Sequence, residues 1–243
     1  MRSLLRLLRP YALGVRRDRA TGHLFYPVEG FRHYIRFPDE TIREHYRQRA
    51  FDQVYFNRYR PSGRDCVVDI GAGLGTEILP LARSAPELHY IAVEIQPWVY
   101  ECLCLTLAQL PAGFIPFNLA IGDAEEVTIA PTRDGEDATL LGGGPVRVPG
   151  ISWTEFARRH GIEQVDLLKM NVEGAEGDLL DHIELARVRR IIVNVHDFRA
   201  DRGEGEGFRT RDRVETRLRS TGFDVSRVTQ DWLYAERSPS AGF

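Results

Sequence analysis

The chain has 243 residues, of which 43% are hydrophobic and 28% are charged, and its formal net charge is -3. This length suffices for one sizeable hydrophobic core, and the composition excludes disordered, collagen-like and disulfide-scaffold classes. No apolar run reaches the roughly 18 residues that a transmembrane helix requires. The leucine-rich N-terminal segment is interrupted by Arg6 and Arg9 and ends at Pro10, so we do not expect a signal peptide.

The cysteines and the basic residues indicate the environment of the protein. Cys102 and Cys104 are two residues apart on a helical pattern, so their side chains diverge, and the total of three cysteines is odd. We therefore expect a reducing, cytoplasmic compartment. Basic side chains are scattered along the chain, which argues against a nucleic-acid partner. The basic stretch up to Arg19 is compatible with peripheral contact with a membrane, although a solvated start of the fold is the favoured interpretation.

Residues 1–60 are expected to form an N-terminal extension of helix, hairpin and helix. The first helix is short and amphipathic and ends near Pro10. The hairpin follows from two apolar segments, residues 24–26 and 34–37, which flank Glu29-Gly30.

The second helix of the extension has a start signal and a buried face. Thr41 and Glu44 have the spacing of a capping box. An apolar stripe recurs every four residues, at Ile42, Tyr46, Ala50 and Val54. Residues 61–63, Pro-Ser-Gly, then form a turn, and we place the boundary of the main domain there.

Residues 61–237 are expected to form an α/β domain, followed by a flexible tail over residues 238–243. Buried-strand patterns alternate with helical patterns, which is typical of a parallel sheet with helices on both faces. The expected parallel strands are residues 66–70, 90–93, 114–119, 165–172 and 190–195. Two further strands, residues 223–228 and 232–236, are too close together for a crossover helix and should pair antiparallel.

A long connection separates the third and fourth parallel strands. Residues 127–151 contain too many glycines and prolines for a crossover helix: Gly135, Gly142, Gly143, Gly144, Pro145, Pro149 and Gly150. We expect a hairpin that carries a mobile flap over the site, because long connections of this kind are often lids. A purely structural ornament at the edge of the sheet is nearly as good an interpretation.

The strongest functional signal is the segment VVDIGAGLG at residues 67–75, a strand that runs into three alternating glycines. Such a turn brings the backbone close to a nucleotide-like ligand. The spacing here is GxGxG, whereas dinucleotide-binding sites have GxGxxG, with the third glycine one residue further along the chain. Asp69 before the turn would repel a pyrophosphate but suits an ammonium group, which favours S-adenosylmethionine. Expected cofactor contacts are therefore Asp69, Gly71, Ala72, Gly73, Gly75 and Thr76.

Two further strand ends are expected to complete the cofactor site. Glu94 follows the second strand about twenty residues beyond the loop, where a carboxylate can accept hydrogen bonds from both ribose hydroxyls. An exposed carboxylate at a strand end is the less favoured alternative. Asn118 and Ala120 end the third strand, where such residues line an adenine pocket, although turn chemistry explains Asn118 and Gly122 equally well.

The second functional signal is the segment DLLKMNVEGAE at residues 166–176, in which a strand brings Asn171, Glu173 and Glu176 to the carboxyl edge of the sheet. Together with the glycine loop, this segment resembles the FkbM-type methyltransferase family over roughly residues 50–235. The resemblance implies a Rossmann-like class I methyltransferase fold with a mostly parallel seven-stranded sheet and an antiparallel C-terminal hairpin. It also implies S-adenosylmethionine as donor and a hydroxyl of a sugar, glycan or secondary metabolite as methyl acceptor.

The chain departs from the family at a position that bears on catalysis. The family usually has aspartate at the position of Asn171, and asparagine neither accepts a proton nor binds a hard cation well. We therefore assign no metal ligands. His196 ends the fifth strand and is the predicted proton acceptor, with a packing role as the alternative. Glu173 would orient His196 or hold the acceptor hydroxyl, while Asn171 would supply a hydrogen bond. Asn194 is a second departure, because family members often have an acidic residue two positions before the histidine.

Two other classes of function stay open at this point. A homologue that keeps the cofactor pocket without the carboxylate at position 171 would act as a binding protein. A nicotinamide-dependent oxidoreductase is disfavoured by the glycine spacing and by the terminal hairpin. The expected acceptor is a small molecule or a glycan, contacted by residues 1–60 and 127–151, and the chain is compatible with a homo-oligomer.

Overall fold

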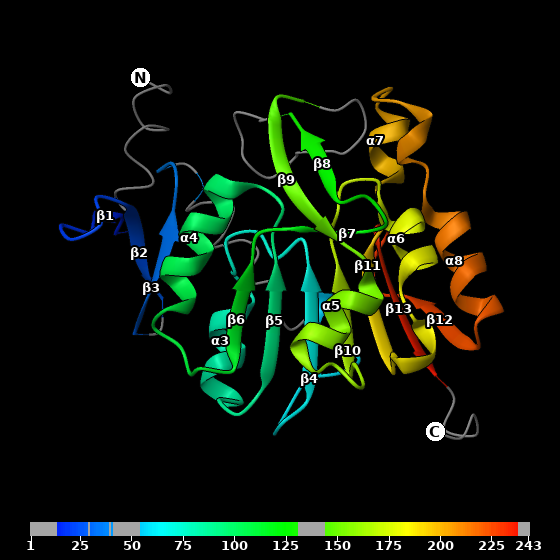
Figure 1. Ribbon diagram of the computed structural model, residues 1–243, viewed down its shortest axis with the longest axis horizontal. Helices are drawn as coiled ribbons and strands as arrows, with labels where there is room; N and C mark the ends of the chain where they lie inside the picture. Colours follow the sequence, from blue (N-terminus) through cyan, green and yellow to red (C-terminus); the bar gives the residue numbers. More distant parts are fainter. Residues whose placement is uncertain (1–13, 29, 39, 41–53, 131–143, 238–243) are drawn as a thin grey trace.

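The computed structural model describes residues 14–28, 30–38, 40, 54–130 and 144–237 (Figure 1). The predicted first helix, nearly all of the predicted second helix from Thr41 and the predicted tail lie outside the described residues. Within the described ranges, no helix is both long enough and apolar enough to cross a membrane.

The described core is one seven-stranded sheet with the strand order β12-β13-β11-β10-β4-β5-β6. Strands β4, β5, β6, β10 and β11 pair in parallel, and β13 is antiparallel to both β11 and β12. This confirms the predicted parallel sheet and its antiparallel C-terminal hairpin. The bounds are β4 (Cys66–Ile70), β5 (His89–Val93), β6 (Phe114–Phe117), β10 (Leu167–Met170), β11 (Arg190–Asn194), β12 (Phe223–Arg227) and β13 (Trp232–Arg237).

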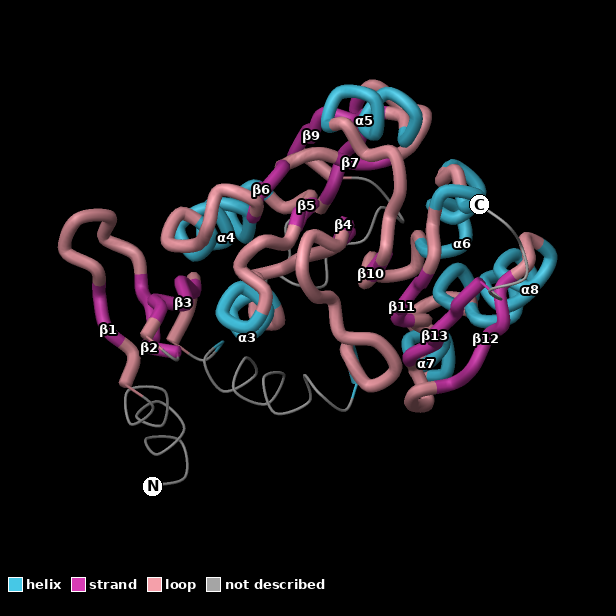
Figure 2. The backbone as a smooth tube through the Cα atoms, turned by 90° about the horizontal axis from the view of Figure 1, so that it is seen from below, coloured by secondary structure: helices cyan, strands magenta, loops and turns pink. Residues whose placement is uncertain are grey.

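Helices cover both faces of this sheet, which is why its strands are continuous apolar runs (Figure 2). Val68, Leu168 and Ile191 face one side and pack against α5 (Trp153–His160), α6 (Glu176–His182) and α8 (Arg211–Ser220). Their neighbours Val67 and Leu167 face the other side and pack against α3 (Ile78–Ser84) and α4 (Pro97–Leu107). The short helix α7 (Asp197–Asp201) follows β11. Alternation along each strand thus supplies two hydrophobic layers.

The predicted N-terminal hairpin is present as β2 (Leu24–Val28) and β3 (Phe31–Ile35), and β1 (Arg16–Arg17) adds a short third strand. Tyr26 and Ile35 are buried against Val99 of α4 and against Leu74 and Leu79. Because Leu74 belongs to the glycine loop, the extension helps to support the segment at which ligand binding is predicted.

The predicted hairpin between the third and fourth parallel strands is also present. Strands β8 (Glu126–Ile129) and β9 (Val146–Ile151) pair antiparallel, and β7 (Ala120–Ile121) pairs in parallel with β9. Gly150 is needed for this packing, because a Cβ atom there would lie 2.0 Å from the Ala124 carbonyl oxygen. The hairpin extends beyond the carboxyl edge of the central sheet (Figure 1). Residues 131–143, on which the predicted flap depends, lie outside the described part.

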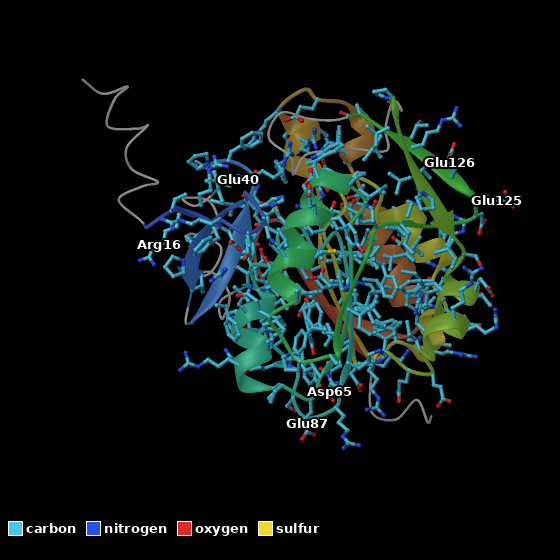
Figure 3. All side chains as sticks on the ribbon, turned by 60° about the vertical axis from the view of Figure 1, so that its left-hand side comes forward. Arg16, Glu40, Asp65, Glu87, Glu125 and Glu126 are labelled. Atoms are coloured by element: carbon cyan, nitrogen blue, oxygen red, sulfur yellow. The ribbon has the colours of Figure 1, made fainter. Side chains whose placement is uncertain are left out.

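The two ends of the central sheet differ in what they carry. Asp65 and Glu87, which precede β4 and β5, lie at the amino end of the sheet (Figure 3). The glycine loop and the segment after β10 lie at the opposite, carboxyl end. This is the edge at which ligands bind in open α/β sheets.

Candidate active site

A pocket opens at the carboxyl edge of the central sheet, between the segments that follow β4, β5 and β10. It encloses about 940 Å³ of space, part of which is open to solvent. Eight of the predicted site residues line it: Gly71, Ala72, Gly73, Thr76, Glu94, Ala120, Asn171 and Glu173. Other lining residues, for which no role is predicted from the sequence, include Tyr55, Glu77, Gln96, Val99, Lys169 and Leu179. Four predicted residues lie outside the lining: Asp69, Gly75, Asn118 and His196.

The three glycines of the loop have positive φ angles of 79°, 57° and 78°, but their surroundings differ. A Cβ atom on Gly71 would lie 1.9 Å from the Asn171 carbonyl oxygen, and one on Gly75 would lie 2.8 Å from Leu103. These two glycines allow close packing against neighbouring segments. A Cβ atom on Gly73 would meet nothing within 4 Å. Gly73 is therefore the glycine that leaves room for a ligand, whereas Gly75 packs against α4.

Glu94 connects the loop after β4 with the segment after β5. Its Oε2 accepts a hydrogen bond of 2.9 Å from the Gly73 N–H, and its Oε1 accepts one of 2.8 Å from the Gln96 N–H. Burial raises the pKa of Glu94 to about 7, against the opposing effect of these two N–H donors. A buried carboxylate at the pocket wall that keeps unused lone pairs is suited to accept hydrogen bonds from ligand hydroxyls.

Asn118 supports this segment from outside the pocket. Its Nδ2 donates to the carbonyl oxygens of Glu94 and Ile95, at 2.8 Å and 2.9 Å. Ala120, two residues later, does line the pocket. The strand end predicted to form an adenine pocket thus contributes Ala120 to the wall, while Asn118 holds the loop that carries Glu94.

Asp69 differs from its predicted position. It is fully buried, its Oδ1 accepts from Lys169 Nζ at 2.8 Å, and its Oδ2 accepts from the Tyr90 hydroxyl at 2.7 Å. Burial raises the pKa of Asp69 to about 6, although Lys169 opposes the shift. Because Asp69 is fully buried and does not line the pocket, it is not placed to hold a ligand ammonium. The physical reason is register, because Asp69 and Lys169 are directly paired across β4 and β10.

Lys169 links Asp69 to the pocket wall. Its Nζ lies 2.5 Å from Glu77 Oε1 and 3.3 Å from the Gly71 carbonyl oxygen, in addition to its bond with Asp69. Burial lowers the pKa of Lys169, but the carboxylates of Asp69 and Glu77 outweigh it and raise the pKa. Asp69, Glu77 and Lys169 thus form a buried charged cluster. The sequence contains one sign of it, because the only lysine of the chain lies inside an apolar strand.

His196 is fully buried between two carboxylates. Its Nδ1 donates to Glu176 Oε1 at 2.6 Å, and its Nε2 lies 3.1 Å from Glu173 Oε1. Burial lowers the pKa of His196, but the hydrogen bonds to both carboxylates outweigh it and raise the pKa to about 9. The ring is therefore charged at neutral pH and both nitrogens are occupied. This arrangement argues against the predicted role of His196 as proton acceptor.

Glu173 is a pocket residue with an unusual backbone. Its φ angle of 52° makes it the non-glycine residue with a left-handed backbone in the described ranges. Its Oε2, the oxygen that is not paired with His196, accepts from Arg199 Nη1 at 2.8 Å. Burial raises the pKa of Glu173, but His196 and Arg199 outweigh it and lower the pKa. Glu173 thus presents an ionised carboxylate to the pocket, and backbone strain of this kind occurs at functional sites.

Asn171 also lines the pocket, and its partner is a second amide. Its Oδ1 accepts from Asn194 Nδ2 at 2.9 Å, and its backbone N–H donates to the Ile70 carbonyl oxygen. Two neutral amides therefore stand at the positions where the resemblance implied acidic residues. In the part of the chain that the structure describes, no group of three or more His, Cys, Asp or Glu side chains is arranged to hold a metal ion.

Comparisons with known proteins identify relatives of this chain. The sequence profile of the methyltransferase FkbM domain matches residues 69–225, which is more than half of the chain. Methyltransferase sdnD of Sordaria araneosa is 27% identical over 208 residues, covering 68% of this chain and 76% of that protein. The AMB antimetabolite synthetase AmbE of Pseudomonas aeruginosa is 42% identical over 76 residues, covering 30% of this chain and 3% of that protein.

Solved structures with a similar arrangement of elements were also found. Fibrillarin of Aeropyrum pernix, in complex with natively bound S-adenosyl-L-methionine, has a TM-score of 0.47 at 14% identity, covering 90% of this chain and 83% of that chain. An O-methyltransferase family protein from Burkholderia thailandensis has a TM-score of 0.49 at 14% identity, covering 81% of this chain and 57% of that chain.

Proposed function

The chain belongs to the FkbM methyltransferase family, and on this premise we propose that it methylates a hydroxyl oxygen of a sugar, a glycan or another secondary metabolite. The methyl donor of this methyltransferase is S-adenosylmethionine. Family membership decides against the nicotinamide-dependent oxidoreductase considered from the sequence.

One observation carries this proposal. A single pocket is lined both by the glycine loop with Glu94, here called the cofactor side, and by Asn171 with Glu173, here called the acceptor side. The first pair of features suits a nucleoside, and the second pair suits a neutral hydroxyl that needs a hydrogen-bond acceptor. Placing both in one cavity would hold a donor and an acceptor next to each other, and positioning of this kind supplies much of the rate in transfer reactions.

The cofactor side of the pocket fits S-adenosylmethionine through features of its wall. Gly73 leaves open space beside the loop, and the buried carboxylate of Glu94 would accept hydrogen bonds from the ribose hydroxyls. Ala120 and its apolar neighbours Leu119 and Ile121 would contact the adenine. When bound, this cofactor supplies a methyl group activated by a positively charged sulfur.

The acceptor side would orient the hydroxyl rather than deprotonate it in advance. Glu173 would accept the hydrogen bond of the hydroxyl, with its carboxylate fixed by His196 and Arg199. Asn171 would contribute a second hydrogen bond from its amide. An oxygen that has gained a methyl group is strongly acidic, so Glu173 or water can take its proton late in the step. His196 is then a positioning residue that holds Glu173.

The charges on the acceptor side favour one second candidate. Both nitrogens of His196 are engaged, and the pKa of Glu173 is lowered, so the described residues on this side include no strong general base. A homologue that binds the cofactor with little turnover would also have such a site.

The proposal is tested with methyl-labelled S-adenosylmethionine and panels of sugars, glycans and hydroxylated natural products. S-adenosylhomocysteine release measures turnover, and mass spectrometry with NMR locates the added methyl group. A label on an oxygen supports the proposal, whereas a label on nitrogen or carbon refutes it. Tight cofactor binding without turnover on any panel member supports the second candidate.

A further inference from the structure

A buried group of charges beneath the glycine loop carries one more negative charge than positive. Asp69, Glu77 and Lys169 are 0%, 4% and 3% exposed, so solvent does little to stabilise them. Lys169 pairs with both carboxylates, at 2.8 Å and 2.5 Å. Two carboxylates against one ammonium leave one negative charge uncompensated, and such a charge is costly to bury.

The hydrogen bonds of this group show which carboxylate oxygen is free to bind a ligand cation. All three N–H donors of Lys169 have acceptors, namely Asp69, Glu77 and the Gly71 carbonyl oxygen. Both oxygens of Asp69 are also engaged, by Lys169 and Tyr90. Glu77 uses its Oε1 for Lys169, and within the described ranges no hydrogen bond is found to its Oε2. Glu77 lines the pocket, whereas Asp69 does not.

We propose that Glu77, held in place by Lys169, binds the ammonium group of the methionine part of S-adenosylmethionine. The inference rests on the proposed cofactor site and assigns to Glu77 the contact that the sequence suggested for Asp69. A ligand ammonium beside Glu77 would balance the buried charges and satisfy its second oxygen through a charge-assisted hydrogen bond. Glu77 follows Thr76 directly, so this contact lies on the same loop as the nucleoside contacts.

The inference is tested by calorimetry with ligands that differ in their amino-acid part. S-adenosylhomocysteine has the ammonium, its deamino analogue lacks only that group, and 5′-methylthioadenosine lacks the whole amino-acid part. The charge-assisted bond predicts that Glu77→Gln weakens S-adenosylhomocysteine binding by about 10- to 100-fold. The same substitution should leave the affinities for the deamino analogue and methylthioadenosine unchanged.

Glu94→Gln is the matched control, because all three ligands keep the ribose. It should weaken all three by a similar factor, with thermal melting used to show that both variants are folded. Equal weakening of S-adenosylhomocysteine and methylthioadenosine by Glu77→Gln would overturn the inference, and so would an unchanged affinity for S-adenosylhomocysteine.

Wild-type protein alone provides a second measurement, should the variant fail to fold. It should bind the deamino analogue at least about 10-fold more weakly than S-adenosylhomocysteine. Equal affinity for the two ligands would overturn the inference while leaving the cofactor site intact. Wild-type protein that binds neither S-adenosylhomocysteine nor methylthioadenosine would overturn the proposed function itself, and the inference with it.

Discussion

Cofactor affinity is expected to depend on pH through Glu94. Burial raises the pKa of this carboxyl from 4.5 to about 7, so near neutrality it is divided between protonated and ionised forms. At about 1.36 kcal/mol per pKa unit, the shift corresponds to an order of 3 kcal/mol against the ionised form in the free protein. Ribose hydroxyls donate to the ionised form, so binding should favour deprotonation and be weakened by acid.

The size of this pH dependence follows from the one proton that Glu94 must release when the ligand binds. Below its pKa, the affinity for S-adenosylhomocysteine should fall up to about tenfold per pH unit, until protonation of the complex limits the change. The stability of the ligand-free protein should show the opposite trend. A raised folded-state pKa contributes stability that is present below pH 4.5 and is lost as the pH rises through about 7.

Calorimetric titration with S-adenosylhomocysteine at several pH values between 5.5 and 8.5 measures this dependence. Glu94→Gln is the control, because it removes the titrating group and leaves Asp69, whose pKa burial raises to about 6, as the source of any residual slope. The wild-type slope should exceed that of the variant. Identical slopes, or a wild-type affinity that is constant over the whole range, would refute the reasoning.

Three further predictions follow from the same geometry. Gly73→Val should weaken S-adenosylhomocysteine binding at least tenfold in a folded protein, whereas Gly75→Val should mainly lower the melting temperature; the reverse pattern would contradict their assigned roles. His196→Ala should destabilise the protein by about 3–5 kcal/mol in chemical denaturation, because Glu173 and Glu176 would lose their shared cation. The contribution of His196 should be complete below pH 6.5 and be lost as the pH rises through about 9, so a deficit independent of pH would count against it. Turnover, once an acceptor is known, should survive chelation, and loss restored by magnesium would show that a metal site exists.

The amino-acid sequence by itself determined the architecture and the edge of the sheet at which the pocket lies. Buried parallel strands are continuous apolar runs and hairpins need turn residues, so local pattern was enough for the central sheet and for the β2–β3 and β8–β9 hairpins. The sequence also predicted that the glycine loop and Glu94 lie together, because both directly follow strands and the carboxyl ends of parallel strands meet at one edge.

Only the tertiary structure decided which charged side chains line the pocket and which are buried beneath it. The register of β4 against β10 pairs Asp69 with Lys169 beneath the loop and leaves Glu77 at the wall. Likewise, His196 forms ion pairs with both Glu173 and Glu176, because the segment after the neighbouring strand β10 brings these two carboxylates to its ring. Strand periodicity and turn chemistry act over a few residues and can be recognised in sequence. Hydrogen-bond partners and the resulting pKa shifts depend on groups far apart in the chain, whose distances are set only when the sheet has assembled.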